Sequence, residues 1–207
     1  MRNRRVSFAA GFTLVELVIV VAIVLFIMAI GYPLLHNLII RGKLEGAVCE
    51  IAMLLQQAKL EAIKRSVPTV IRVDTAGREI ISFADVNGPS LTDPPDGIYN
   101  PVAGQPEHGT DYPIRPALKL AKGTDFQAPL AEPVVEGFTT VGSEQVAIFQ
   151  SDSSMQDDNA IRIANGRSNF LEVRVAPKAT ARVELRKWNG SAFQAAFGEG
   201  GVQWQWY

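Results

Sequence analysis

The residue types that most often carry out catalysis are few in this chain and lie far apart. The 207 residues include two histidines, His36 and His108, and one cysteine, Cys49. Cys49 follows His36 by 13 residues, which on one helix is about 20 Å, too far for a nucleophile and its base. The sequence contains no Walker loop, no Gly-x-Ser-x-Gly and no His-Glu-x-x-His. It therefore predicts a protein that is not an enzyme, with no catalytic or cofactor-binding residue.

Three carboxylates lie close together in the sequence and could bind a calcium ion. Asp152, Asp157 and Asp158 stand within one polar stretch. Their spacing lacks the glycine and the distal glutamate of an EF-hand loop. The stretch therefore predicts a solvated turn rather than a metal site.

Arginines in the C-terminal half could attract phosphate groups. Residues 67–159 carry five basic and 14 acidic side chains, whereas residues 160–190 carry seven basic and two acidic ones. Arg174, Arg182 and Arg186 share the parity of Glu172 and Glu184, which predicts one polar face of a hairpin. This face could follow a nucleic-acid backbone, or it could be a salt-bridged surface or a docking surface for an acidic partner. The net charge of −1 gives no global attraction for nucleic acid.

The first 40 residues combine a basic start with a long apolar run that contains one carboxylate. Three arginines stand among the first five residues, and Glu16 is the one formal charge in the 29 residues of 12–40. A helix of about 20 apolar residues spans a bilayer. Three arginines precede the run, whereas Arg41 and Lys43 follow it with Glu45 close by, and this asymmetry favours a cytoplasmic N-terminus. A carboxylate inside such a segment is costly, so Glu16 needs a partner.

Two simpler explanations of this run fit less well. A secretory signal peptide has a shorter apolar region and a small-residue cleavage site, for which Gly31-Tyr32-Pro33 is a poor candidate. A plain signal anchor requires apolar length and flanking arginines but does not explain Glu16.

The segment Gly11-Phe12-Thr13-Leu14-Val15-Glu16 resembles the prepilin processing site of type IV pilins and type II secretion pseudopilins. The resemblance implies that a prepilin peptidase cleaves after Gly11, that the new N-terminal Phe12 is N-methylated, and that Glu16 is required for assembly. It implies a leader over 1–11, a helix over 12–66 with a membrane and polymer half (12–40) and an amphipathic half (41–66), and a β-rich domain over 67–207.

The same resemblance implies a structural role and a location. The chain would be a minor pilin or pseudopilin that supports protein secretion or fibre assembly. It would cross the bacterial inner membrane once, with its β-domain in the periplasm, before it enters a pilus or pseudopilus. Its partners would be other pilin-type subunits, the prepilin peptidase and methyltransferase, and possible secreted cargo.

The alternative is a DNA-binding minor pilin of a competence system. Such relatives have a Gly-Arg-x-Arg element near the C-terminus, and Gly166-Arg167-Ser168-Asn169 supplies only its first half. Nucleic acid is therefore the less favoured partner.

A physical reason for Glu16 follows from the implied cleavage. Cleavage creates an α-amine with an ordinary pKa of about 7.7–8.0 next to an apolar medium. An ion pair between the ammonium of Phe12 in one subunit and Glu16 of its neighbour removes two unpaired charges at once.

The helix should continue beyond the apolar run, because a second pattern follows it. Apolar residues recur in steps of four and three, which predicts one amphipathic helix that ends at Ser66-Val67-Pro68. Gly31 and Pro33 are expected to interrupt it, and Cys49 to pack as a small apolar side chain beside Val48. The stripe consists of Leu44, Val48, Ile51, Leu55, Ala58 and Ala62.

After Pro68 the pattern has a period of two and predicts an antiparallel β-domain against the helix, an α+β fold. A hairpin is expected over 70–83 with its turn at Asp74-Thr75-Ala76-Gly77, followed by a Pro- and Gly-rich loop over 87–116. The tail alternates and places Trp204 and Trp206 on one side, as a closing strand or an aromatic contact surface. Further strands are expected over 134–140, 145–150, 160–163, 169–176 and 180–188.

Within the superfamily the layout is most similar to the H-type minor pseudopilins and their pilus relatives. The matching features are the helix end and hairpin in QQAKLEAIKRSVPTVIRVD, and the strand Val146–Phe149 that leads to Ala160–Ile163. The chain has Ser151-Asp152-Ser153-Ser154 where that group usually has a glycine, and this is a departure from its pattern.

Overall fold

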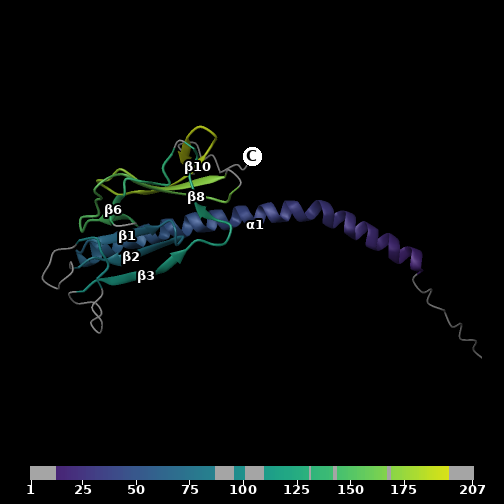
Figure 1. Ribbon diagram of the computed structural model, residues 1–207, viewed down its shortest axis with the longest axis horizontal. Helices are drawn as coiled ribbons and strands as arrows, with labels where there is room; N and C mark the ends of the chain where they lie inside the picture. Colours follow the sequence, from purple (N-terminus) through teal and green to yellow (C-terminus); the bar gives the residue numbers. More distant parts are fainter. Residues whose placement is uncertain are drawn as a thin grey trace, which may run out of the picture. The chain divides into compact units, whose positions relative to one another are not determined.

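The structure is a computed structural model that describes residues 13–86, 96–100, 110–130, 132–141, 144–166 and 169–195. The chain divides into two compact units, Met1–Ile40 and Arg41–Tyr207. Helix α1 (Leu14–Arg65) provides the described structure of the first unit and continues into the second, where eleven strands follow it among the described residues (Figure 1).

Helix α1 is continuous over its 52 residues, so the predicted interruption at Gly31 and Pro33 is wrong. A proline removes one backbone hydrogen bond of a helix, whereas the bonds before and after it remain. The predicted end is confirmed: Arg65 is the last helical residue, and Ser66 adopts a positive φ of 55° before Val67-Pro68. The left-handed conformation of Ser66 ends the helix, and Pro68 keeps Val67 out of the helical region.

The first sheet has five antiparallel strands in the order β3-β2-β1-β7-β6. The predicted hairpin is confirmed as β1 and β2, and the Asp74 carboxylate accepts the backbone N–H groups of Ala76 and Gly77 in its turn. The strands of this sheet are β1 (Thr69–Asp74), β2 (Glu79–Ala84), β3 (Tyr112–Lys119), β6 (Thr139–Val141) and β7 (Glu144–Phe149).

The second sheet has six strands in the order β11-β10-β9-β8-β4, with β5 also paired to β8. All of its pairs are antiparallel, and three of its long strands were predicted from the period of two. The strands are β4 (Asp125–Phe126), β5 (Val135–Glu136), β8 (Asn159–Ala164), β9 (Phe170–Val175), β10 (Val183–Trp188) and β11 (Phe193–Ala195).

Two predictions about these strands are wrong. The loop expected over 87–116 ends earlier, because Tyr112–Lys119 is the edge strand β3 despite its two prolines. An edge strand tolerates proline, since one side of it needs no ladder donor. The single strand expected over 134–140 is two strands in different sheets, separated at Gly137. Gly137 has φ of +74°, and a Cβ there would lie 2.0 Å from the carbonyl oxygen of Asp158. Only glycine fits at this position, where the chain passes from the six-stranded sheet to the five-stranded sheet.

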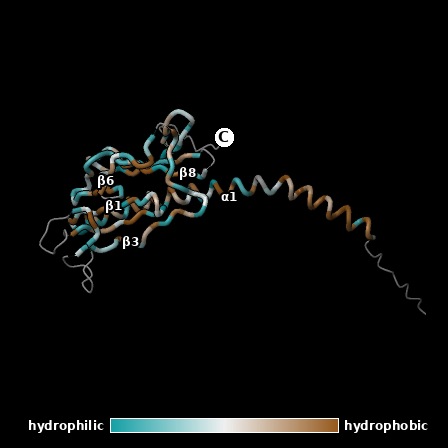
Figure 2. The backbone as a smooth tube through the Cα atoms, in the orientation of Figure 1, coloured by the Kyte–Doolittle hydropathy of each residue, from teal (hydrophilic) through white to brown (hydrophobic). Residues whose placement is uncertain are grey.

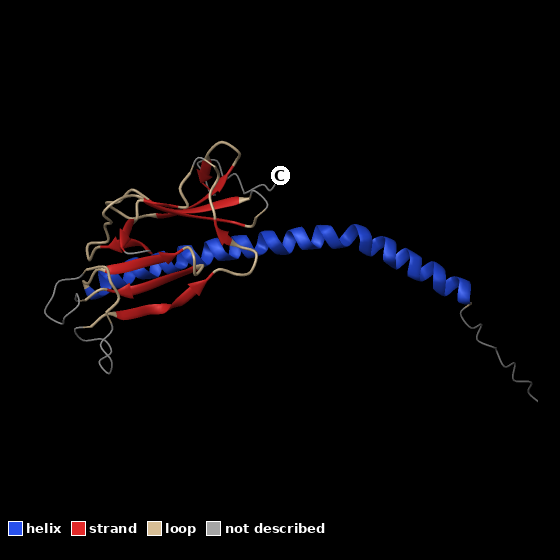
Figure 3. Ribbon diagram, viewed as in Figure 1, coloured by secondary structure: helices blue, strands red, loops and turns tan. Residues whose placement is uncertain are grey.

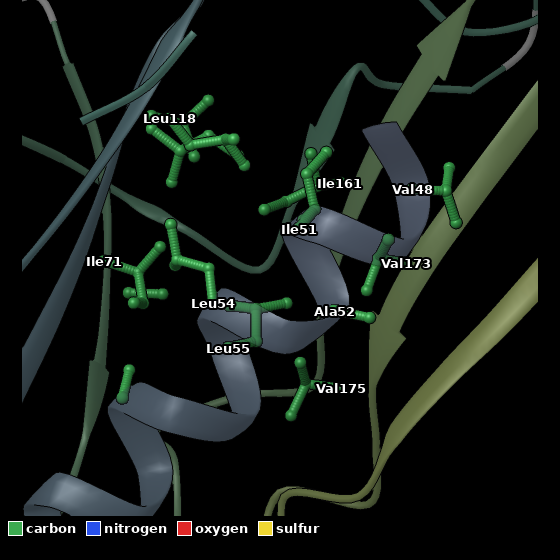
Figure 4. Close-up of a cluster of buried hydrophobic side chains, with 14 of the residues drawn as sticks. Val48, Ile51, Ala52, Leu54, Leu55, Ile71, Leu118, Ile161, Val173 and Val175 are labelled. Atoms are coloured by element: carbon green, nitrogen blue, oxygen red, sulfur yellow. The ribbon is translucent and has the colours of Figure 1, made fainter. Parts of the chain in front are cut away.

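The core of the second unit lies between α1 and both sheets (Figure 3). The predicted stripe from Leu44 to Ala62 is buried throughout. Figure 4 shows Leu54 pointing toward Ile71 and Leu118 of the five-stranded sheet. On the other side Leu55 lies with Val173 and Val175 of the six-stranded sheet. One helical face therefore packs against two sheets.

Two carboxylates hold segment 96–100 near the end of β2. Asp111 accepts the N–H of Val86 at 2.9 Å and that of Asn100 at 2.7 Å, and Asp85 accepts the N–H of Gly97 at 2.6 Å. Burial, together with the charges of Asp111 and Asp96, raises the pKa of Asp85 to about 6, although the hydrogen bond from the Gly97 N–H acts in the opposite direction.

The two faces of α1 predict a sharp contrast in stability. Leu54 is fully buried and Leu60 is 64% exposed on the same helix. We expect Leu54→Ala to lower the free energy of unfolding by about 2–5 kcal/mol, because it leaves a cavity. Leu60→Ala should change it by less than about 0.5 kcal/mol. Denaturant unfolding of the detergent-solubilised chain, followed by tryptophan fluorescence, measures both; equal losses would contradict this packing.

Candidate assembly site

The predicted site lies at the start of α1, and part of it can be described. Gly11 and Phe12, the predicted cleavage and methylation residues, lie outside the described residues. Thr13 is the first described residue, and the helix begins at Leu14 with Glu16 in its first turn.

The Glu16 carboxylate is hydrogen-bonded within its own turn. Its Oε2 atom accepts the backbone N–H and the hydroxyl of Thr13, both at 2.9 Å. In return, the backbone N–H of Glu16 donates to the Thr13 hydroxyl oxygen at 3.2 Å. This reciprocal pair is a capping box, which satisfies donors that the first turn of a helix leaves without partners.

Thr13 is the site residue that the sequence analysis did not identify. A threonine followed three residues later by a glutamate, just before an apolar run, is the sequence signature of a capping box. This local signature predicts the contact between Thr13 and Glu16, in addition to the assembly role that the resemblance implies for Glu16. Thr13 orients the carboxylate before any partner arrives.

The apolar run behind Glu16 is exposed in the isolated chain. From Leu14 to Ile30 every residue is exposed, and Figure 2 shows the apolar character along this part of α1. By length and composition α1 is able to cross a membrane, and none of its most apolar window is buried. Such a surface needs lipid or other apolar chains around it, since large exposed apolar patches mark interaction sites.

The three arginines of the predicted patch each have a carboxylate nearby. Arg182 and Arg186 lie 3.5 Å and 3.3 Å from Glu184, and Arg174 lies 3.9 Å from Glu136. Phosphate binding would therefore compete with ion pairs that already exist on this face. The nucleic-acid or partner role of the patch stays a prediction.

The fourth arginine on the same face is buried. Arg162 is 2% exposed, and its guanidinium lies 2.7 Å from the Glu172 carboxylate, which is 1% exposed. It also donates to the carbonyl of Pro133 at 2.6 Å and lies over the Phe193 ring. Burial raises the pKa of Glu172, and the guanidinium of Arg162 opposes that shift. The predicted polar face is therefore partly covered, and Glu172 is not available to a partner.

Two of the aspartates that the sequence offers as calcium ligands accept hydrogen bonds from other groups of the same domain. Asp152 accepts the N–H and hydroxyl of Ser154, which lower its pKa, and Asp158 accepts the N–H of Lys178 at 2.7 Å. Among the described residues no group of three or more His, Cys, Asp or Glu side chains could hold a metal ion.

Cys49 is exposed rather than packed, because it lies on the opposite side of α1 from the buried stripe. Trp204 and Trp206 are not described.

Comparison with known proteins gives one match. Residues 7–32 match the family model described as the prokaryotic N-terminal methylation motif, which covers the predicted cleavage segment and residues 12–32 of the apolar run. No curated protein and no solved structure matches the chain.

The capping box predicts a local effect at Thr13. Thr13→Val keeps the shape of the side chain but removes the hydroxyl that donates to Glu16 and accepts from its backbone N–H. We expect the first turn to lose about 1 kcal/mol of local stability, and its amides to exchange about fivefold faster. Hydrogen exchange in detergent micelles measures this, with Thr13→Ser as the control that keeps the cap. Equal exchange in the valine and serine variants would contradict the capping role.

Proposed function

From the N-terminal methylation motif, which marks the chain as a pilin or pseudopilin of the type IV pilin superfamily, we propose that it is a minor structural subunit of a pilus or pseudopilus. It is made as an inner-membrane precursor, cleaved after Gly11, and assembled into a type IV pilus or a type II secretion pseudopilus. The observation that carries this proposal is the motif at 7–32, together with the exposed apolar side chains from Leu14 to Ile30 of α1.

The exposed half of α1 supports both stages of this pathway. Burying a large apolar side chain contributes about 1.5–3 kcal/mol relative to leaving it in water. A helix with such side chains all round is stable in a bilayer or among other apolar helices. Transfer from the membrane into a fibre therefore exchanges lipid for helix without exposing the apolar run to water.

Glu16 sets the axial position at which the helix of this subunit aligns with the helix of its neighbour. In the single subunit the carboxylate has two donors, both from Thr13. A carboxylate can accept more than two hydrogen bonds, so a third donor can join without breaking the capping box. We assign this donor to the methylated ammonium of Phe12 in a neighbouring subunit. An uncompensated charge at any other register is costly, and this cost selects the correct one.

The ion pairs of the second unit favour a structural role over DNA uptake. Arg174, Arg182 and Arg186 each lie within 4 Å of a glutamate, so the face has alternating charge rather than a row of unpaired cations. Sequence-independent DNA binding depends on cations that neutralise successive phosphates. The β-domain therefore provides contacts to neighbouring subunits or cargo.

Processing is the first test of the family assignment. Cleavage after Gly11 should leave a chain that begins at Phe12, and N-methylation should add one methyl group to it. Mass spectrometry of the membrane-extracted protein measures both. An intact N-terminus at Met1 in cells with an active prepilin peptidase would refute the proposal.

The pairing mechanism is tested at Glu16. Glu16→Ala should still insert into the membrane, because removing a charge makes the segment more apolar. Cleavage should persist, since the peptidase acts at Gly11, whereas co-purification with the other minor subunits should be lost. Glu16→Asp keeps the charge with a shorter reach and should incorporate partially.

Glu16→Ala and Thr13→Val together separate the capping role of Glu16 from its proposed pairing with Phe12. The capping box stabilises a helix end, so its loss alone would raise exchange of the first turn without preventing assembly. Thr13→Val removes most of the cap and keeps the carboxylate. Normal assembly of Glu16→Ala would contradict the pairing mechanism, while its cleavage would leave the family assignment intact.

A further inference from the structure

A short segment of the chain covers the outer face of the five-stranded sheet, on the side away from α1. Because side chains alternate along a strand, Ile71 points to the core around the helix and Val70 to the outer face. On that face Val70, Phe83 and Val146 form a separate buried cluster. The Tyr99 ring packs against the Phe83 ring, with 5.1 Å between the centroids.

Gly97 brings the backbone of the same segment close to this cluster. A Cβ at Gly97 would lie 3.7 Å from a methyl group of Val146 and 3.8 Å from a methyl group of Ile148. Residues 96–100, which we call the strap, therefore keep an apolar patch of the sheet out of water. Such a patch is costly to expose, at about 25 cal/mol for each Å².

Two buried carboxylates attach the strap to the sheet. Asp85, which is 1% exposed, accepts the N–H of Gly97 at 2.6 Å. Asp111, which is 3% exposed, accepts the N–H of Asn100 at 2.7 Å. Asp111 also accepts the N–H of Val86, the residue that follows Asp85, at 2.9 Å. The two carboxylates therefore hold the two ends of the strap from neighbouring positions.

The charges that act on Asp85 are both negative. They belong to Asp111 and to Asp96, the first residue of the strap. The Oδ1 atom of Asp85 is buried and has no hydrogen-bond donor among the described residues. A buried carboxylate with negative neighbours, half of which lacks a donor, favours its protonated form.

The other elements packed near Asp85 do not neutralise it. The chain before β1 provides the carbonyl of Pro68, which accepts the N–H of Asp85 at 3.0 Å. The end of α1 provides Arg65, which lies over the Tyr112 ring and is paired with Glu61. None of the charges that act on Asp85 in the described part of the chain is positive.

An anchor with a structural role alone would not need an ionisable group at this position. An asparagine has the same shape, and its amide oxygen accepts a backbone N–H without a charge to bury. With aspartate, the hold on Gly97 depends on whether the carboxyl has taken up a proton.

We propose that the strap is a proton-controlled cover of the outer sheet face. A proton on Asp85 holds residues 96–100 against the sheet, and loss of that proton loosens the strap and uncovers Phe83 and Val146. The inference needs neither a fibre nor a partner, so it is independent of the proposed function.

The direction of the effect follows from the two states of Asp85. Its pKa is about 6 under the strap and returns toward the ordinary 3.8 when the strap leaves the carboxyl in water. Because the closed strap binds the proton more tightly, closing is most favoured below about pH 3.8, and this advantage is lost as the pH rises through about 6. Between pH 5 and pH 7 the ratio of closed to open strap should fall about tenfold.

Hydrogen exchange of the full chain in detergent micelles measures this opening. The Gly97 and Asn100 amides should be about tenfold more protected at pH 5 than at pH 7, after correction for the intrinsic exchange rate at each pH. The Ala76 and Gly77 amides, which the less buried Asp74 holds, are the internal control and should be equally protected at both pH values. Equal strap protection at the two pH values, stronger protection at pH 7, or a parallel change at the control amides would overturn the proposal.

Two matched variants assign the effect to one carboxyl group. Asp85→Asn keeps the shape and an acceptor for Gly97 but takes up no proton, so its strap should be equally protected at pH 5 and pH 7. Asp96→Asn changes an exposed carboxylate of the same segment and should retain most of the tenfold difference. A full pH dependence in Asp85→Asn would overturn the proposal, because another group would then control the strap.

A titration of the unchanged chain decides the question even where Asp85→Asn does not fold. In ¹³C NMR of the aspartate-labelled chain, the carboxyl carbon of Asp85 should titrate with a pKa of about 6, and the Gly97 amide should shift with the same midpoint. A midpoint for Asp85 below about pH 5, near the ordinary range of aspartate, would overturn the proposal.

Discussion

The two sheets of the globular unit depend on one face of helix α1. Side chains from Leu44 to Ala62 form a single cluster with residues of both sheets, so the helix is the element that the sheets share. Protein interiors are close-packed, and a void between such layers is costly. The buried face is therefore committed to the fold, and contacts with other subunits must use the remaining surface of α1 or the outer surfaces of the sheets.

The outer face of the six-stranded sheet is held by charge rather than by apolar packing. Arg162 and Glu172 are both nearly inaccessible to solvent, and Glu136 and Glu132 approach the same guanidinium from the edge of the sheet. A buried ion pair is expensive to form, yet losing one member costs about 3–5 kcal/mol because the other charge is left unpaired. Arg162 also connects β8 to the carbonyl of Pro133 and to the ring of Phe193, so the segments that carry them are held to one side chain.

The periodic parts of the structure could be predicted from the sequence. The buried stripe of α1 and the hairpin of β1 and β2 follow directly from apolar residues at helical spacing and at a spacing of two. The α+β arrangement with one long N-terminal helix is confirmed. Gly11 and Phe12 lie outside the described residues, so their roles remain predictions.

The parts that could not be predicted depend on contacts between distant residues. Pro113 and Pro116 indicate a loop unless it is known that β3 is an edge strand. The crossing at Gly137 depends on the nearby carbonyl of Asp158, which no local pattern reveals. Cys49 was expected to pack beside Val48, but neighbouring positions on a helix point about 100° apart, and one of them is exposed. Thr13 differs, because its capping signature is local and was available in the sequence.

The shared helical face also sets an order for folding. Ile71 of β1 follows Ile51 by 20 residues, whereas Val173 of β9 follows it by 122. A chain that emerges with its N-terminus first can cover the part of this face that contacts β1 early, but the part that contacts β8 and β9 stays in water until those strands have followed. Contacts across such long separations form slowly, and apolar surface exposed meanwhile is prone to aggregation. A bilayer around the first half of α1 covers its apolar side chains during this interval, so the apolar surface left in water is the uncovered core face of the second half.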